Sequence, residues 1–267
     1  MKDNLLLETA AGIARGAGQI VLDCFHKGVH CRSKGDFDVV TEADELAESF
    51  ILSRLREVAP EHAVLSEESG DNAKGHAYRW YIDPLDGTKN FAHGHACFCT
   101  MLALEHDGEL ALAVVFDPVR DELFTAQRGG GAWCNGVPVA VSPIERPAGA
   151  LITSGYPSSK RHRNSNAELF LDMTMNCQAL RRTGCSGLDF AYVAAGRFDA
   201  VWDWGLEPWD IAPGLLLVRE AGAQCTTWNG EPYRIGSPDV LAANPALHQP
   251  LLSLLQRHAD LSRTHQR

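Results

Sequence analysis

The chain has 267 residues, of which 45% are hydrophobic and 22% are charged, an ordinary balance for a globular protein with a substantial core. Its formal net charge of −10 argues against nucleic acid as a partner, because surfaces that bind nucleic acid are usually basic. We find no uninterrupted apolar run long enough to span a membrane, and the start, Met1-Lys2-Asp3-Asn4, does not resemble a signal peptide. The 8 cysteines form no CxxC pair, which favours free thiols and a cytoplasmic location.

Hydrophobic periodicity predicts helices and short strands in the first part of the chain. In order, we expect a helix, a hairpin or loop, a second helix and two strands: Leu5–Phe25, Cys31–Val40, Thr41–Val58, Ala63–Ser66 and Tyr78–Ile82. Thr41 and Asp44 resemble the capping box that opens a helix. We expect Pro84 to end the last strand, because proline cannot donate to a sheet ladder.

An antiparallel meander is predicted next, from three strands separated by turn signals. The predicted strands are Phe98–Leu104, Leu110–Phe116 and Glu122–Ala126. Gly129-Gly130-Gly131 lacks the lysine and hydroxyl residue of a P-loop, so we interpret it as a turn.

Helices and strands alternate in the rest of the chain. The predicted elements are Leu151–Ser154, Asn164–Met175, Ala179–Arg182, Ser186–Ala195, Ala200–Trp204 and Trp209–Glu220, two more short strands, and a final helix over Pro245–His258. Helices layered on mixed sheets indicate an α/β sandwich of the α+β type. A proline-containing segment near Ser142–Ala150 divides the chain into an N-terminal half, 1–145, and a C-terminal half, 146–267.

Five acidic residues stand where strands or loops give way to helices, which is where ligands collect in α/β folds. They are Asp44, Glu67, Asp83, Asp86 and Asp210. Each one alone could be a helix cap or a solvated acid. Asp83 and Asp86, however, directly precede Gly87-Thr88, which predicts the opening of a short helix. Carboxylates there suit hard cations, and the free N–H groups of the helix suit a phosphate.

Four segments resemble sequence signatures of the inositol monophosphatase family. They are Asp38-Val39-Val40-Thr41-Glu42-Ala43-Asp44, Ser66-Glu67-Glu68-Ser69, Asp83-Pro84-Leu85-Asp86-Gly87-Thr88-Lys89-Asn90-Phe91, and Trp209-Asp210-Ile211-Ala212-Pro213-Gly214 continuing to Gly222. Their order and spacing are those of the family, and the resemblance covers nearly the whole chain. It implies the layered αβαβα sandwich of inositol monophosphatase and fructose-1,6-bisphosphatase. It also implies a lithium-sensitive, Mg²⁺-dependent phosphatase that forms a homodimer.

The resemblance implies a role for each acidic residue in metal binding. Glu67, Asp83 and the main-chain carbonyl of Leu85 would hold a first Mg²⁺. Asp83, Asp86 and Asp210 would hold a second, and the family binds two or three in each site. Carboxylate ligands of this kind select Mg²⁺, with Mn²⁺ as a substitute, over softer metals.

Catalytic and phosphate-binding roles follow from the same resemblance. Asp44 and Thr88 would activate the attacking water, and Glu67 completes the catalytic candidates. The N–H groups of Gly87 and Thr88 would bind the phosphate. This agrees with phosphomonoester hydrolysis, which needs an activated water and neutralised phosphoryl oxygens.

Substrate recognition is expected from the second half of the chain. Gly184, Cys185 and Ser186 resemble the turn that meets the polyol, Asp210 lies beside them in the family, and Asp203 stands where inositol phosphatases usually have a glutamate. The shorter aspartate leaves inositol 1-phosphate as the preferred substrate but keeps alternatives open. These are histidinol phosphate, fructose bisphosphate, other sugar phosphates and nucleotide 3′-phosphates.

A non-enzymatic alternative is a regulatory binding protein on a phosphatase scaffold. The complete set of acidic ligand residues argues against it, because a decayed site has no reason to keep them all. We also considered a zinc site in His93-Gly94-His95-Ala96-Cys97-Phe98-Cys99. Strand alternation and the lack of a second ligand cluster in the sequence favour packing at the start of a strand instead.

Overall fold

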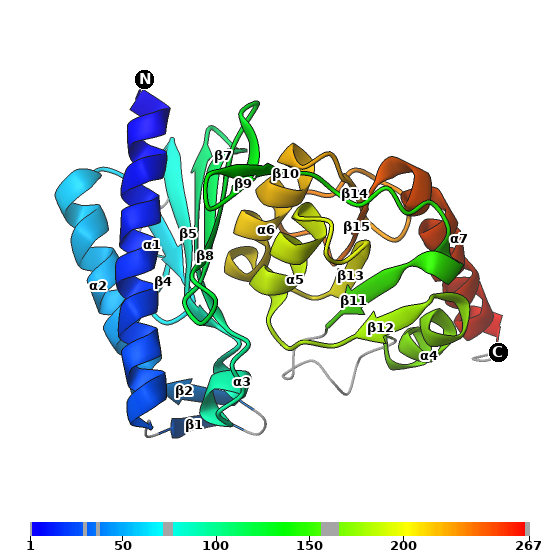
Figure 1. The fold of residues 1–267 in the computed structure, drawn as a ribbon, viewed down its shortest axis with the longest axis horizontal. Coiled ribbons are helices and arrows are strands. Elements are labelled where there is room, and N and C mark those ends of the chain that lie inside the picture. The colour runs from blue at the N-terminus through cyan, green and yellow to red at the C-terminus, as the bar shows by residue number, and fades with distance from the viewer. Residues whose placement is uncertain (1, 29–30, 36–37, 72–76, 156–165, 265–267) are drawn as a thin grey trace.

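The computed structural model describes the chain except residues 1, 29–30, 36–37, 72–76, 156–165 and 265–267. Within the described residues, helices and sheets alternate in layers (Figure 1). The helices are α1 (Lys2–Lys27), α2 (Glu42–Val58), α3 (Thr88–Ala92), α4 (Asn166–Asn176), α5 (Ser186–Ala194), α6 (Pro208–Glu220) and α7 (Pro245–Thr264). Helices α1 and α2 cover one face of the larger sheet, α5 and α6 lie between the two sheets, and α4 and α7 cover the far side. The predicted αβαβα sandwich is therefore confirmed.

The larger sheet has 8 strands in the order β10-β9-β8-β7-β6-β5-β3-β4. Their bounds are β3 (Ala63–Ser66), β4 (Gly70–Asp71), β5 (Tyr78–Asp86), β6 (Cys99–His106), β7 (Glu109–Asp117), β8 (Glu122–Gln127), β9 (Gly131–Cys134) and β10 (Val137–Val139). From β5 to β10 each strand pairs antiparallel with the next, which confirms the predicted meander. The sequence did not predict β9 and β10, which are too short for a clear alternation of hydrophobicity.

The smaller sheet has 5 strands in the order β12-β11-β13-β15-β14. Their bounds are β11 (Leu151–Ser154), β12 (Ala179–Arg181), β13 (Ala200–Trp204), β14 (Gln224–Thr226) and β15 (Asp239–Ala243). Strands β12, β11 and β13 are parallel, and β15 is antiparallel to both β13 and β14. The parallel strands end on the side from which the chain enters α5, so polar residues at those ends lie close together.

Strands in the middle of the sandwich are apolar on both faces because each face meets a helix layer. In β6, Met101 and Ala103 pack toward α5 and α6, whereas Leu102 and Leu104 pack toward α1 and α2. In β13, Val201 joins the first of these cores and its neighbours join the core beside α4 and α7. Continuous apolar runs therefore mark the strands that lie deepest in the fold.

The prediction that Pro84 ends its strand is wrong. Strand β5 continues to Asp86, with an irregular register between Asp83 and Asp86 opposite β6. Its other neighbour, β3, pairs no further than Ser66 opposite Ile82. Beyond that point β5 has a ladder on one side only, so a proline at a bulge removes no hydrogen bond that the sheet needs.

Helix α1 carries a stretch, Leu5–Lys27, that by length and composition alone could cross a membrane. In the fold it packs on the larger sheet so closely that a Cβ at Gly18 would lie 2.4 Å from the ring of Phe116. Its buried residues are Ala10, Ile13, Ala14, Ala17 and Val21. One face of α1 therefore packs on the sheet, and the absence of a membrane partner stays a prediction.

The hairpin before α2 is formed by β1 (Cys31–Gly35) and β2 (Asp38–Thr41), as predicted, although residues 36–37 lie outside the described part. The predicted capping box is also present at the start of α2: Thr41 donates its N–H to Asp44 at 2.8 Å. The first two residues of the helix predicted from Asn164 lie outside the described residues, and α4 begins at Asn166. The division into halves 1–145 and 146–267 stays a prediction.

Candidate active site

One cavity brings together most of the acidic residues that the sequence singled out. Its volume is about 420 Å³, within the roughly 300–1,000 Å³ that is usual for small-molecule sites. Its walls come from β5, α3, the turn before α5, the end of β13 and the start of α6. The lining residues that were candidates from sequence are Glu67, Asp83, Leu85, Asp86, Gly87, Thr88, Gly184, Cys185, Ser186, Asp203 and Asp210.

The bulge at the end of β5 is held from both sides. Asp83 is 1% exposed, and its Oδ1 accepts a hydrogen bond of 3.0 Å from the N–H of Leu85. The Leu85 carbonyl accepts one of 2.9 Å from the Thr88 hydroxyl. From β6, the Thr100 hydroxyl donates to the Pro84 carbonyl at 2.9 Å. These bonds fix the Asp83 carboxylate and the Leu85 carbonyl at the cavity wall.

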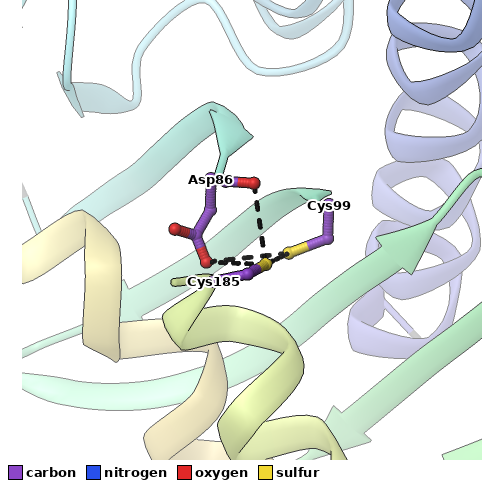
Figure 2. A group of neighbouring side chains, drawn as sticks. All are labelled: Asp86, Cys99 and Cys185. Carbon is purple, nitrogen blue, oxygen red and sulfur yellow. Dashed lines mark hydrogen bonds between the residues drawn. The ribbon is translucent and has the colours of Figure 1, made fainter. Parts of the chain in front are cut away.

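Asp86 connects the end of β5 to the start of α5 through its side chain. Its Oδ2 accepts hydrogen bonds from the N–H of Gly187 at 2.6 Å, the hydroxyl of Ser186 at 3.2 Å and the thiol of Cys185 at 3.2 Å. Figure 2 shows Cys185 and Cys99 on the same side of this carboxylate. Burial raises the pKa of Asp86, and the Gly187, Cys185 and Ser186 donors oppose that rise.

The carboxylates around the cavity repel one another. Burial raises the pKa of Asp83 well above its ordinary value, and the charges of Glu67, Asp86 and Asp210 raise it further. The pKa of Asp210 is also raised well above its ordinary value, first by burial and then by Asp86. Asp210 lies in the first turn of α6, as predicted, and its Oδ2 accepts a bond of 2.9 Å from the N–H of Glu207. This concentration of negative charge needs protons or cations for neutralisation.

Asp44 lies behind the cavity and reaches it through Thr88. Its Oδ2 accepts the Thr41 hydroxyl at 2.6 Å, and its Oδ1 lies 3.3 Å from the Thr88 hydroxyl. Asp44 is 1% exposed. Burial raises its pKa to about 6, against the lowering effect of its hydrogen bonds to Thr41. A carboxyl with that pKa is well placed to accept a proton near neutral pH.

Asp203 lies near the end of β13 and lines the same cavity as the carboxylates of β5. The N–H of Trp204 donates to its Oδ1 at 2.7 Å. Burial raises the pKa of Asp203 to about 7, although the Trp204 and Gly155 N–H groups and the charge of Arg182 lower it. Asp203 therefore feels the charge of a cationic side chain, Arg182, that lines the same cavity.

Further cavity residues were not predicted from the sequence. They are Lys89, Asn90, Gly155, Arg182, Asp189, Leu206, Glu207 and Trp209. Asp189 is 3% exposed and accepts a bond of 2.8 Å from the Thr183 hydroxyl, while burial raises its pKa well above the ordinary value. An aspartate inside the otherwise apolar stretch of α5 was the available signal for it. Arg182 carried no such signal, because arginines at strand ends are usually solvated.

The donor set fits a hard divalent cation. The buried carboxylate of Asp83, the half-buried carboxylates of Asp86 and Asp210, the carboxylate of Glu67 and the carbonyl of Leu85 all belong to residues that line one cavity. Oxygen donors of this kind are the ligands of Mg²⁺ and Mn²⁺. The repulsion that raises the pKa of Asp83 is what such a cation would relieve.

The fold and the cavity define a layered αβαβα protein whose site combines clustered carboxylates with a short helix start. A model of the inositol monophosphatase family matches residues 3–260. The chain belongs to that family.

Similar proteins and structures agree with this assignment. The chain is 39% identical over 262 residues to "Nus factor SuhB" of Pseudomonas aeruginosa, covering 95% of this chain and 96% of that protein. The structure of extragenic suppressor protein suhB from Bartonella henselae superposes with a TM-score of 0.89 at 33% identity, covering 94% of this chain and 98% of that one. The inositol monophosphatase from Anabaena (Nostoc) sp. PCC 7120 superposes with a TM-score of 0.87 at 34% identity, covering 96% and 97%.

Proposed function

We propose that this protein is a Mg²⁺-dependent phosphomonoesterase that hydrolyses a small polyol phosphate, inositol 1-phosphate. The observation that carries the proposal is the convergence of Glu67, Asp83, Asp86 and Asp210 on one cavity of about 420 Å³. Membership of the inositol monophosphatase family supports it. A small phosphate ester fits a cavity of this size, and its charge requires the cations that these carboxylates would bring.

Each acidic residue has a proposed place in cation binding. Glu67, Asp83 and the Leu85 carbonyl would hold one Mg²⁺, and Asp83, Asp86 and Asp210 would hold a second. Bound Mg²⁺ supplies positive charge that neutralises the phosphoryl oxygens. The hydrogen bonds to Asp86 from the start of α5 orient its carboxylate and favour its charged form against the effect of burial, so that the fold positions this ligand in advance.

Thr88 and Asp44 form the proposed proton relay. The Thr88 hydroxyl lies at the cavity wall, 2.9 Å from the Leu85 carbonyl and 3.3 Å from Asp44 Oδ1, and in the relay its one proton turns from the carbonyl to Asp44. It takes a proton from the attacking water while passing its own to Asp44, whose pKa of about 6 leaves it mainly deprotonated at pH 7. The N–H groups of Gly87 and Thr88, at the start of α3, would bind the phosphate.

The alcohol part of the substrate is proposed to lie toward Asp203. Gly184, Cys185, Ser186 and Arg182 line the same cavity as Asp203. Asp203 could accept a bond from a ring hydroxyl directly or through a water. Histidinol phosphate and other sugar or nucleotide phosphates remain the alternative substrates, because a buried aspartate does not select inositol by itself.

The test is phosphate release from inositol 1-phosphate, histidinol phosphate, fructose 1,6-bisphosphate and adenosine 3′,5′-bisphosphate, with Mg²⁺ and with EDTA. We expect Mg²⁺-dependent release that favours inositol 1-phosphate. Asp86→Asn should abolish release, and Asp107→Asn is its matched control, because Asp107 lies in the turn between β6 and β7 and is 74% exposed as a side chain. Equal activity of the two variants would refute the proposed metal assignment.

A regulatory role is the second candidate, and one observation favours it. Relatives that are 36–39% identical to this chain carry the name "Nus factor SuhB". We infer that a regulatory activity could accompany or replace hydrolysis in this chain. Absence of release from the whole panel in Mg²⁺, by a folded protein, would favour the regulatory role. The homodimer and the cytoplasmic location stay predictions, to be tested by light scattering and by cell fractionation.

A further inference from the structure

Two buried thiols, from two different elements of the fold, lie beside the carboxylate of Asp86. Cys99 lies in β6 and is 0% exposed, and Cys185 is the N-cap of α5 and is 1% exposed. Their Sγ atoms lie 3.6 Å apart. The distances to Asp86 Oδ2 are 3.2 Å from Cys185 and 3.9 Å from Cys99, so the three atoms form a compact triangle (Figure 2).

We propose that Asp86, Cys99 and Cys185 form a binding site for a thiophilic divalent cation, with Zn²⁺ and Cd²⁺ as its ligands. The triangle has the size that a tetrahedral zinc site requires. Zinc bonds of about 2.3 Å to sulfur and about 2.0 Å to oxygen put two sulfurs about 3.8 Å apart, and a sulfur and an oxygen about 3.5 Å apart. The observed sulfur–sulfur separation is 3.6 Å, and the sulfur–oxygen separations of 3.2 and 3.9 Å lie on either side of the expected value, so small side-chain movements suffice.

The sequence argument against zinc in the segment His93–Cys99 was the lack of a second ligand cluster. Folding supplies that cluster from elsewhere, because Cys185 and Asp86 are 86 and 13 residues distant from Cys99 along the chain. The histidines of the segment are not members of the triangle. The site therefore uses one cysteine of that segment, in a combination that no spacing rule predicts.

Thiol donors distinguish this site from the oxygen site beside it. Sulfur ligands select soft or borderline cations, and Mg²⁺ gains little from them. Binding would displace the two thiol protons to solvent and leave two thiolates and one carboxylate on the cation. Asp86 and Cys185 line the cavity, so an ion can enter from there and reach Cys99 in the wall behind.

The consequence is inhibition, and this part rests on the proposed function. Asp86 cannot present the same geometry to Mg²⁺ when its Oδ2 binds a cation that two thiolates also hold. A thiophilic cation would also replace the hydrogen bond by which the Cys185 thiol supports Asp86. We therefore expect Zn²⁺ or Cd²⁺ to inhibit Mg²⁺-dependent hydrolysis by occupying this site.

The experiment measures binding without using turnover. The full chain, stripped of metal and kept under a phosphine reductant, is titrated with Cd²⁺ while the ultraviolet thiolate-to-cadmium charge-transfer band is followed. We expect one equivalent of Cd²⁺ to bind tightly and to give a charge-transfer band with the intensity of two cadmium–thiolate bonds. Cys99→Ala should weaken it at least roughly tenfold, because loss of even an outer-shell partner costs about 10–100-fold in metal affinity. Cys99→Ser is the second variant, and it keeps the size of the buried side chain.

Cys24→Ala is the matched control, since it removes a partly buried thiol of α1 that is not in the triangle. It should bind Cd²⁺ as the unaltered chain does. A two-thiolate band that persists in both Cys99 variants, or its absence from the unaltered chain, would overturn the proposed site. Failure of the proposed function is distinguishable from this, because it would appear as absent hydrolysis in Mg²⁺ alone while cadmium binding still depended on Cys99.

Discussion

Gly87 is the residue at which a single methyl group should damage both the fold and the site. It is the N-cap of α3 with a φ of 91°, in the left-handed region that L-residues rarely adopt. A Cβ there would lie 2.7 Å from the Cys97 carbonyl oxygen and 3.1 Å from the Phe98 Cα. Neither neighbour can withdraw easily, because the Cys97 carbonyl accepts a bond of 2.8 Å from Asn90 and Phe98 is 0% exposed.

Gly94 provides a matched control two residues beyond the other end of α3. Its φ is 72°, but a Cβ there would meet nothing within 4 Å. Gly94→Ala should therefore cost only the left-handed backbone penalty, about 1–2 kcal/mol. Gly87→Ala should cost that penalty plus about 1–3 kcal/mol of overpacking, a total of about 2–5 kcal/mol. The effect of each substitution on the unfolded chain is the same and cancels in the comparison.

The assay is urea unfolding of both variants in EDTA, followed by circular dichroism. We expect Gly87→Ala to lose about 1–3 kcal/mol more than Gly94→Ala, and to unfold about 2–12 °C lower in a thermal scan. Gly87→Ala should also lower kcat, because relief of the clash moves Thr88 relative to Asp44. Equal losses in the two variants would show that the close approach of Gly87 to the start of β6 does not constrain the fold.

Three further predictions concern the chemistry of the site. Thr88→Val should lower kcat about 10²–10⁴-fold with little change in KM, by removing the proton relay, and an unchanged kcat in steady-state kinetics would exclude Thr88 from it. Because burial raises the pKa of Asp44 to about 6, kcat/KM at saturating Mg²⁺ should fall as pH drops through about 6, and a flat profile to pH 5 would contradict this role. Burial raises the pKa of Asp203 to about 7 in the fold, so the folded chain binds more protons than the unfolded one above about pH 4. Without metal, the free energy of unfolding should therefore decrease as the pH rises from 4 to 7, by up to about 4 kcal/mol from this group. Mg²⁺ should raise Tm more at pH 8 than at pH 5. Calorimetry with EDTA and with Mg²⁺ can check both expectations.

Most elements could be predicted from sequence because local signals and burial agreed. Three of these signals depend only on residues that are close together in the chain. They are the helical spacing of apolar residues in α1, the capping box at Asp44 and the turn signals of the meander. Pro84 misled the prediction because a proline's effect depends on whether its strand has partners on both sides. The sequence does not show where the ladder between β3 and β5 ends, and that end is what makes the proline harmless.

Some residues of the candidate site could likewise be predicted from sequence, and others could not. Asp83 and Asp86 were evident because they lie in one segment beside a helix start, and the family signatures brought Glu67 and Asp210 to them. Arg182 and Asp189 were missed because their positions matter only after folding brings them to the same cavity as the end of β5. The triangle of Asp86, Cys99 and Cys185 depends wholly on tertiary structure.

The fold accommodates the carboxylates of Asp83 and Asp86 in two different ways. Burying a charge is costly unless it is hydrogen-bonded or paired. Burial raises the pKa of Asp86, and the donors from Gly187, Ser186 and Cys185 oppose that rise and favour the charged form. Asp83 instead faces the charges of its neighbours, which raise its pKa together with burial. One carboxylate is therefore prepared by the protein, while the other depends on protons or a cation. Since one of the donors that prepare Asp86 is a thiol, and a second thiol lies 3.6 Å from it, the support for the oxygen site also creates its sensitivity to thiophilic metals.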